Sequence, residues 1–82
     1  MPYIEEKRRF ALTKGGALPE NPGELNFYFT WLAGKYLQKK GERYQTYNDI
    51  MGALEGSKLE IYRRLVSAYE DKKIKENGDI FN

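Results

Sequence analysis

The sequence predicts an all-α protein, an antiparallel helical hairpin with a long C-terminal helix, preceded by a short N-terminal helix. Three observations support this fold class. Apolar side chains within residues 46–76 recur at the spacing of one helix face, and a second such pattern occupies residues 22–40. Only the short segment 41–45 separates the two patterns, and short connections join antiparallel neighbours. We expect residues 1–82 to form a single helical domain.

The first expected helix covers residues 3–13, with Pro2 in its first turn. A helix of this length is marginal in isolation, so it must dock on the rest of the chain. The basic cluster 7–9 is more typical of a solvated face than of a binding site. Residues 14–21 contain two glycines and Pro19 and are expected to form a linker. Two rows are candidates for the docking contact: Tyr3, Lys7 and Phe10, or Ile4, Arg8 and Ala11.

The second helix is expected at residues 22–40. Asn21 can cap its first turn, Pro22 suits the first helical position, and Glu24 stands where a capping box requires an acid. Gly41 is expected to end the helix. The side chains expected to face the core are Leu25, Tyr28, Phe29, Leu32 and Tyr36.

The third helix, residues 46–76, is the element that the rest of the chain is expected to cover. Its apolar side chains occupy a stripe of roughly 120° on the helix surface, which only Lys58 interrupts. Thr46 and Asp49 resemble a capping box at its start, and Gly78 can terminate it. Residues 77–82 form a tail in which Ile80 or Phe81 could pack near the helix end. The core stripe consists of Tyr47, Ile50, Met51, Leu54, Ile61, Tyr62, Leu65, Ala68 and Tyr69.

A second face of the long helix carries the glycines Gly52 and Gly56. Each glycine costs about 1 kcal/mol relative to alanine inside a helix, which is easiest to understand where another backbone or a ligand approaches closely. Phe27 and Trp31 point away from the core face of the second helix and would form an exposed apolar patch. The predicted interface is therefore Phe27, Trp31, Gly52, Gly56 and Leu59, and the predicted assembly is a homo-oligomer, a dimer or higher. Two alternatives stay open: the glycines face the second helix of the same chain, or the first helix covers Phe27 and Trp31.

Arg63 lies on the glycine face and is the strongest candidate for binding an anion. A guanidinium beside small residues can hold a phosphate or carboxylate through two hydrogen bonds. Tyrosines could stack on a base, and neighbouring polar side chains could add contacts. The alternative for Arg63 is an ordinary ion pair with Glu60 or Glu70. The candidate ligand-binding residues are Arg63, Tyr62, Tyr69, Tyr44, Asn48 and Lys58, with Gln45 beside them.

The composition argues against catalysis and against several classes of partner. The chain contains no His and no Cys, which removes most zinc sites and thiol- or His-based catalysis. No catalytic residue, metal ligand or cofactor is expected. A net charge of +2 is too small to indicate nucleic-acid binding, and no apolar run approaches the ~18 residues of a membrane span.

Several short sequence motifs resemble those of a family of short, uncharacterised proteins of bacteriophages and bacteria. They are GELN at residues 23–26, YQTYNDI at 44–50, GALE at 52–55, KLE at 58–60, YRR at 62–64 and YEDKKIKENGD at 69–79. The resemblance covers most of the chain after Gly23. It implies a phage-associated protein but carries no established activity.

We therefore expect a non-enzymatic, oligomeric binding protein in the cytoplasm of a bacterial host cell. Two functions compete. One is a phage anti-defence sponge that sequesters a nucleotide-derived immune signal, and the other is a protein-interaction module that inhibits or escorts a host or phage protein through its exposed aromatic face. A helix-turn-helix-like DNA binder is disfavoured by the near-neutral charge.

Overall fold

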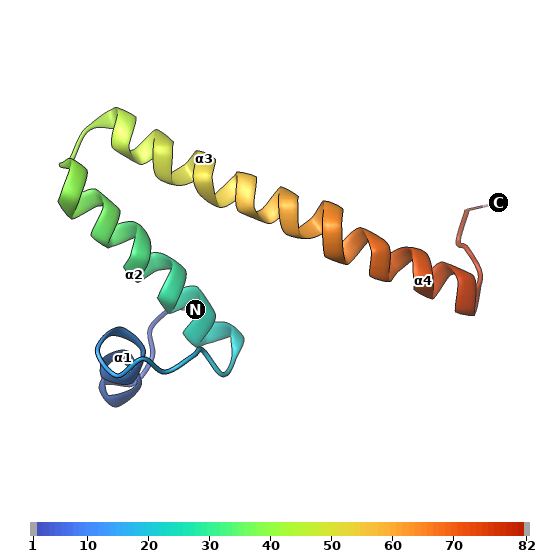
Figure 1. The fold of residues 1–82 in the computed structure, drawn as a ribbon, viewed down its shortest axis with the longest axis horizontal. Helices are drawn as coiled ribbons and strands as arrows, with labels where there is room; N and C mark the ends of the chain where they lie inside the picture. The colour runs from blue at the N-terminus through green and yellow to red at the C-terminus, as the bar shows by residue number, and fades with distance from the viewer. Residues whose placement is uncertain (1, 82) are drawn as a thin grey trace. The chain divides into compact units, whose positions relative to one another are not determined.

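The computed structural model describes residues 2–81. Most of these residues lie in helices, and none of them lies in a strand. The elements are α1 (Glu6–Thr13), α2 (Pro22–Lys40), α3 (Tyr44–Ile61), the π-helical segment η1 (Tyr62–Val66) and α4 (Ser67–Asn77), shown in Figure 1. The last three follow one another without a break over 34 residues, and together they are called the rod. The all-α class, the short N-terminal helix and the long C-terminal helix are confirmed. The antiparallel arrangement of the second and third helices stays a prediction.

The contacts within the chain gather into two units rather than into the single domain expected. One unit is Met1–Tyr47 and contains α1 and α2, and the other is Asn48–Asn82 and contains most of the rod with the tail. The division falls inside α3, one turn after its start. Each unit therefore has to be understood from its own packing.

The N-terminal helix is shorter than predicted. It begins at Glu6 instead of residue 3, so Pro2 is not in its first turn. Glu5 is extended and provides no side-chain cap, but its carbonyl accepts hydrogen bonds from the N–H groups of Arg8 and Arg9. The segment after α1 turns back at once, because Ala17 N–H donates to the carbonyl of Ala11 at 3.0 Å. The first part of the expected linker is thus held against α1.

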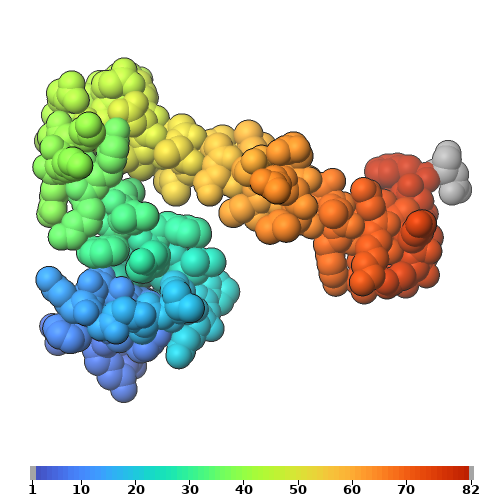
Figure 2. Space-filling model, viewed as in Figure 1, coloured from blue at the N-terminus to red at the C-terminus, as the bar shows by residue number. Residues whose placement is uncertain are grey.

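Helix α1 packs on the start of α2, as the blue and teal segments of Figure 2 show. Leu12 is the one fully buried apolar side chain among residues 2–81. Of the two rows considered for docking, Tyr3 and Phe10 are exposed, whereas Ile4, Arg8 and Ala11 are half-buried. The second row, extended by Leu12, is therefore the contacting one.

The covered face of α2 differs from the predicted one. Glu24 is buried, and Phe27, Tyr28 and Trp31 are half-buried, at the spacing of one helix face. Of the five expected core side chains, Tyr28 is half-buried, whereas Leu25, Phe29, Leu32 and Tyr36 are exposed. Periodicity defined two apolar faces on this helix, and the ion pair described below selects which of them meets α1.

The rod begins two residues earlier than predicted. Its first residue is Tyr44, so Thr46 lies inside the first turn and does not cap it. The Thr46 side chain is fully buried, and its hydroxyl oxygen has no hydrogen-bond partner. The predicted Thr46–Asp49 capping box is therefore wrong. At the other helix ends, Gly41 and Gly78 adopt positive φ angles of 87° and 90° and donate to Leu37 and Ile74, so both predicted terminations are confirmed.

Segment η1 changes the register of the rod. Ser67 N–H donates to the carbonyl of Tyr62, five residues earlier, where an α-helix would use a partner four residues earlier. One extra residue per turn rotates everything after η1 by about 100° relative to an uninterrupted α-helix. Val66 thereby moves from the glycine face towards the core stripe, and Ala68 moves out of that stripe. The single continuous stripe predicted through Ala68 is thus broken at η1.

Candidate functional site

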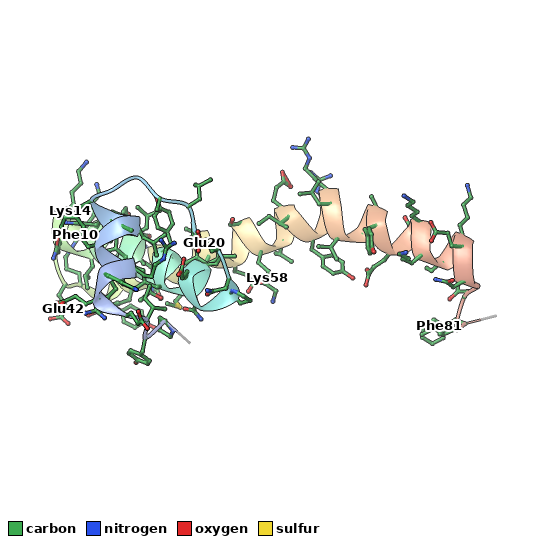
Figure 3. The ribbon with its side chains drawn as sticks, turned by 90° about the horizontal axis from the view of Figure 1, so that it is seen from below. Phe10, Lys14, Glu20, Glu42, Lys58 and Phe81 are labelled. Carbon is green, nitrogen blue, oxygen red and sulfur yellow. The ribbon has the colours of Figure 1, made fainter. Side chains whose placement is uncertain are left out.

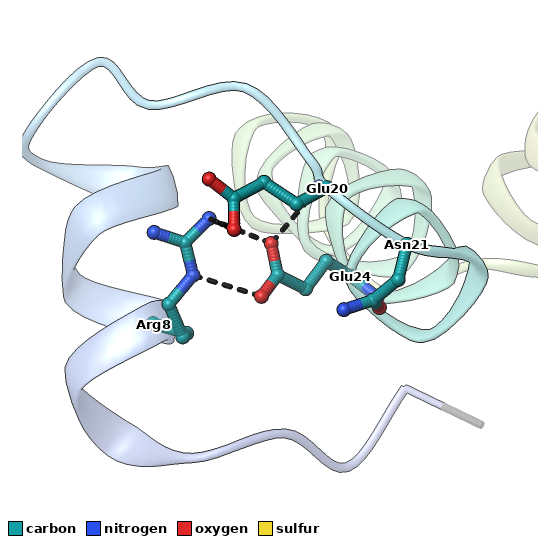
Figure 4. Close-up of polar contacts among 4 residues, drawn as sticks. All are labelled: Arg8, Glu20, Asn21 and Glu24. Carbon is teal, nitrogen blue, oxygen red and sulfur yellow. Dashed lines mark hydrogen bonds and ion pairs between the residues drawn. The ribbon is translucent and has the colours of Figure 1, made fainter.

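A cluster of four hydrogen-bonded or ion-paired side chains joins α1 to the start of α2 (Figure 4). Arg8 Nε donates to Glu24 Oε2 at 2.8 Å, and Arg8 Nη2 donates to Glu24 Oε1 at 2.7 Å. The backbone N–H of Glu20 donates to Glu24 Oε1 at 3.1 Å, and Asn21 Oδ1 caps α2 by accepting from the Glu24 N–H at 2.9 Å. The predicted Asn21 cap is confirmed. The Glu24 carboxylate instead faces Arg8 and the end of the linker.

This arrangement shifts both ionisation equilibria towards the charged forms. The hydrogen bonds from Arg8 lower the pKa of Glu24, and those to Glu24 raise the pKa of Arg8. A bidentate pair between a guanidinium and a carboxylate is geometrically specific. All three hydrogen bonds that the Glu24 carboxylate accepts come from its own chain, so the cluster holds α1 in place.

The role of Arg8 and Glu24 was not recognised in the sequence. The sequence placed Arg8 both in a solvated basic cluster and in one candidate docking row, and Glu24 in a capping box. A signal was present, because Arg8 and Glu24 carry opposite charges in the first turns of two helices that a glycine-containing linker joins. Nothing in one sequence distinguishes this pair from the neighbouring Lys7, Arg9 and Glu20.

The most prominent surface feature lies on the rod. Of the predicted core stripe, Ile50 is half-buried and the other eight members are exposed. Leu65 is 66% exposed and Met51 is 62% exposed. Within its own unit, Asn48–Asn82, the rod meets no second helix, and its side chains stand out around it in Figure 3. Within this unit, the described part of the stripe therefore forms no core.

The glycines of the rod are open. A Cβ atom placed on Gly52 or Gly56 would meet nothing within 4 Å, and Leu59 beside them is exposed. The alternative that these glycines face the second helix of the same chain stays a prediction. Phe27 and Trp31 are half-buried on α2, so the aromatic patch expected there is only partly exposed. Their predicted role in an interface between copies stays a prediction.

Arg63 pairs with a neighbour on its own helix. Its Nη2 donates to Glu60 Oε1 at 2.9 Å and its Nε to the same oxygen at 3.3 Å, which is the ordinary pairing left open above. The Arg63 side chain is 72% exposed, so this pair is weak and can be exchanged for another anion. Lys58 likewise forms an ion pair on its own helix, with its Nζ 3.7 Å from Glu55 Oε2.

Tyr62 and Arg63 are the first two residues of η1. The Tyr62 hydroxyl donates to Glu70 Oε1 at 2.6 Å across the π-helical turn, and this hydrogen bond raises the pKa of Tyr62. π-Helical turns inside α-helices are frequent at functional sites. Two of the predicted ligand-binding residues thus coincide with the one irregular turn of the rod.

The remaining candidates are spread along the rod. Tyr69 is exposed, with Lys73 Nζ 5.4 Å from its ring centre, and Tyr44 and Asn48 are exposed near the rod's start. Asn48 and Arg63 are fifteen positions apart in one helix, or about 22 Å along its axis. One chain therefore does not gather the six predicted residues around one small ligand.

Two further properties limit the chemistry of residues 2–81. The sequence contains no His and no Cys. Within residues 2–81, no three or more Asp or Glu side chains lie close enough together to hold a metal ion. No helix in the same part is both long enough and apolar enough to cross a membrane.

These features define a class: an all-α protein with a small, ion-paired N-terminal unit and a helical rod whose apolar side chains are exposed. The chain belongs to the family described as Domain of unknown function (DUF6899), whose model matches residues 1–80. The resemblance to an uncharacterised family is thereby confirmed. No curated protein and no solved structure matches the chain.

Proposed function

We propose that this protein is a non-enzymatic binding protein that works as a homo-oligomer, with the rod as its self-association surface. One observation carries the proposal: Leu12 is the only buried apolar side chain among residues 2–81, while the rod exposes apolar side chains along its length. Exposed apolar surface of this extent is typical of an interaction site.

The energetics of a lone helix support self-association. Most helical stability in proteins comes from packing an amphipathic face, not from intrinsic propensity. The rod carries Gly52 and Gly56, each of which costs about 1 kcal/mol relative to alanine in a helix interior. Burying an exposed Leu, Ile or Met side chain contributes roughly 1.5–3 kcal/mol. A second copy provides such burial twice, once for each rod.

Light scattering coupled to size-exclusion chromatography tests the proposal directly. We expect a mass of at least two chains at micromolar concentration. A mass of one chain that persists at high micromolar concentration contradicts a homo-oligomer and favours the competing function, in which a different protein covers the rod.

A narrower proposal concerns the ligand. We propose that the oligomer sequesters a nucleotide-derived molecule, with Arg63 holding a phosphate and Tyr62 stacking on a base. The position of both residues in η1, with Arg63 paired only to an exposed Glu60, supports this site. In a phage-infected bacterial cytoplasm such a protein would act as an anti-defence sponge.

The ligand proposal is tested by thermal unfolding with adenine-containing cyclic nucleotides and ADP-ribose. A ligand at a hundred times its Kd stabilises the folded state by about 2.7 kcal/mol. Arg63→Ala should abolish this stabilisation, while Arg64→Ala, which removes the same charge from the adjacent position, should retain it. Stabilisation that survives Arg63→Ala, or none with any of these nucleotides, removes the ligand proposal and leaves the oligomer proposal standing.

The competing function is a module that inhibits or escorts another protein. The row Leu25, Phe29, Leu32 and Tyr36 on α2 favours it, because these apolar side chains are exposed. In this alternative the exposed surface is the row on α2, whereas the sequence predicted an exposed surface formed by Phe27 and Trp31.

A further inference from the structure

The charges of the rod are divided unequally between its two halves. In α3, residues 44–61, three acidic side chains stand against one lysine, which gives a formal charge of −2. In η1 and α4, residues 62–77, five basic side chains stand against three acidic ones, which gives +2. The rod is thus an amphipathic helix with an acidic first half and a basic second half.

The basic half keeps part of its charge uncompensated. Lys73 pairs with Glu76 at 3.2 Å and Arg63 pairs with Glu60 at 2.9 Å. Arg64, Lys72 and Lys75 have no carboxylate within ion-pair distance among residues 2–81. These three cations are available to acidic side chains of another molecule.

We infer that two copies of this chain pair through their rods in antiparallel orientation, the acidic first half of one against the basic second half of the other. This inference rests on the proposed homo-oligomer and names its geometry. In a parallel pair, the two acidic halves, each with a charge of −2, would face each other, and so would the two basic halves, each with +2, which is repulsive. In an antiparallel pair, each acidic half faces a basic half. The helix dipoles favour the same orientation.

The apolar surface agrees with a second copy as the occupant. The exposed side chains Leu54, Ile61 and Leu65 lie near the middle of the rod, where an antiparallel pair has its twofold axis. Gly52 and Gly56 lie about 160° around the helix from Leu54, so they face away from this contact and leave the far side of the rod open. The apolar side chains at the middle of the rod are therefore the part of the stripe that two antiparallel copies can bury on each other.

Antiparallel pairing also changes the candidate ligand site. Within one chain, Asn48 and Arg63 lie about 22 Å apart along the helix axis. In the antiparallel pair, the half of one rod that holds Asn48 lies beside the half of the other that holds Arg63. With the twofold axis at the rod's midpoint, between residues 60 and 61, Asn48 lies opposite position 73 of the second copy, and the second copy's Arg63 is about 15 Å away along the helix axis instead of 22 Å.

Spin labels test the orientation, because the chain has no native cysteine. Asn48→Cys and Asn77→Cys are labelled separately and then mixed, and dipolar spectroscopy measures the distances between copies. Positions 48 and 77 are about 43 Å apart along one rod. Antiparallel pairing predicts that the mixed sample has a shorter distance than either pure sample. If the distances between copies are shorter in both pure samples than in the mixed sample, the pairing is parallel and the inference is overturned.

Charge reversal gives an independent readout. Glu55→Lys with Glu60→Lys changes the first half to +2, and Lys72→Glu with Lys75→Glu changes the second half to −2. Antiparallel pairing predicts that each pair of substitutions weakens association about tenfold or more, and that all four together restore it. Unchanged association in both two-site variants contradicts the inference while the oligomer remains. A wild-type chain that is monomeric in both experiments contradicts the proposed function itself.

Discussion

The two units of this protein are stabilised in opposite ways. In residues 2–47, a bidentate Arg8–Glu24 ion pair and the buried Leu12 hold α1 on α2. In residues 48–81, a long helix exposes its apolar side chains and meets no second helix of its own unit. The comparison teaches that the first unit is held together by contacts between its own helices. The second unit has no such contact among residues 48–81, and it exposes the apolar surface on which the proposed self-association rests.

The largest effect is expected from charging the apolar stripe of the rod. Leu54→Asp combined with Leu65→Asp removes two side chains whose burial contributes roughly 1.5–3 kcal/mol each per copy. We expect a monomer by light scattering and a large loss of helical circular dichroism, because the rod loses its partner. Ala53→Asp, which adds a charge about 100° around the helix from Leu54 and outside the stripe, is the control and should remain oligomeric. Equal behaviour of the two variants would show that the stripe is not an interface.

The next effect concerns the contact between α1 and α2. Leu12→Ala removes the one fully buried apolar side chain of residues 2–81 and should cost about 2–5 kcal/mol locally. Hydrogen exchange should show faster exchange in α1 and unchanged exchange in the rod. Tyr3→Ala, at an exposed position beside α1, serves as the control. Faster exchange in the rod as well would show that the two units unfold together.

A smaller, pH-dependent effect is expected from Glu24. Because Arg8 lowers the pKa of Glu24 below its ordinary value of 4.5, the folded chain binds this proton less tightly than the unfolded chain does. The stabilisation is therefore fully present above about pH 4.5 and is lost as the pH falls through the lowered pKa. Thermal melts across this range should show a decline in the wild type that is reduced in Glu24→Gln.

The Glu24→Gln variant has a second expected property. At neutral pH it should melt at a lower temperature than the wild type, because the glutamine cannot accept both charge-assisted hydrogen bonds from Arg8. Glu6→Gln, an exposed acid on α1, is the control for general acid effects. Identical acid profiles for the wild type and Glu24→Gln would remove Glu24 from this account.

The smallest effect is expected at Thr46. Its hydroxyl oxygen is fully buried without a hydrogen-bond partner, and such a group costs roughly 1–3 kcal/mol. Thr46→Val keeps the shape and removes the unpaired group, so the melting temperature should rise. Thr46→Ser, which keeps the hydroxyl and loses a methyl group, should lower it. A lower melting temperature for Thr46→Val would mean that the hydroxyl is satisfied in solution.

Local signals predicted the helix boundaries well and the packing poorly. Asn21, Pro22 and Gly41 placed α2 at residues 22–40, as observed, because caps and terminations are determined by a few adjacent residues. The choice between the two apolar faces of α2 was wrong, since it depends on the long-range pair of Arg8 and Glu24. One sequence does not show which charged residues meet.

The candidate site was predictable only in part. Tyr62 and Arg63 were selected from their chemistry and their position on the rod. The π-helical turn that contains them was not predicted, because an average spacing of 3.6 residues hides a single extra residue. The same assumption extended the core stripe to Ala68, beyond the point where the turn rotates it away.

The central claim is that the rod is stabilised by another copy of the chain. Its most direct test is the melting temperature of the rod's helical signal, measured over a concentration range on the order of a hundredfold. Mass action predicts a melting temperature that rises steadily with chain concentration. A melting temperature that stays constant over the whole range, with a cooperative transition, would contradict the claim.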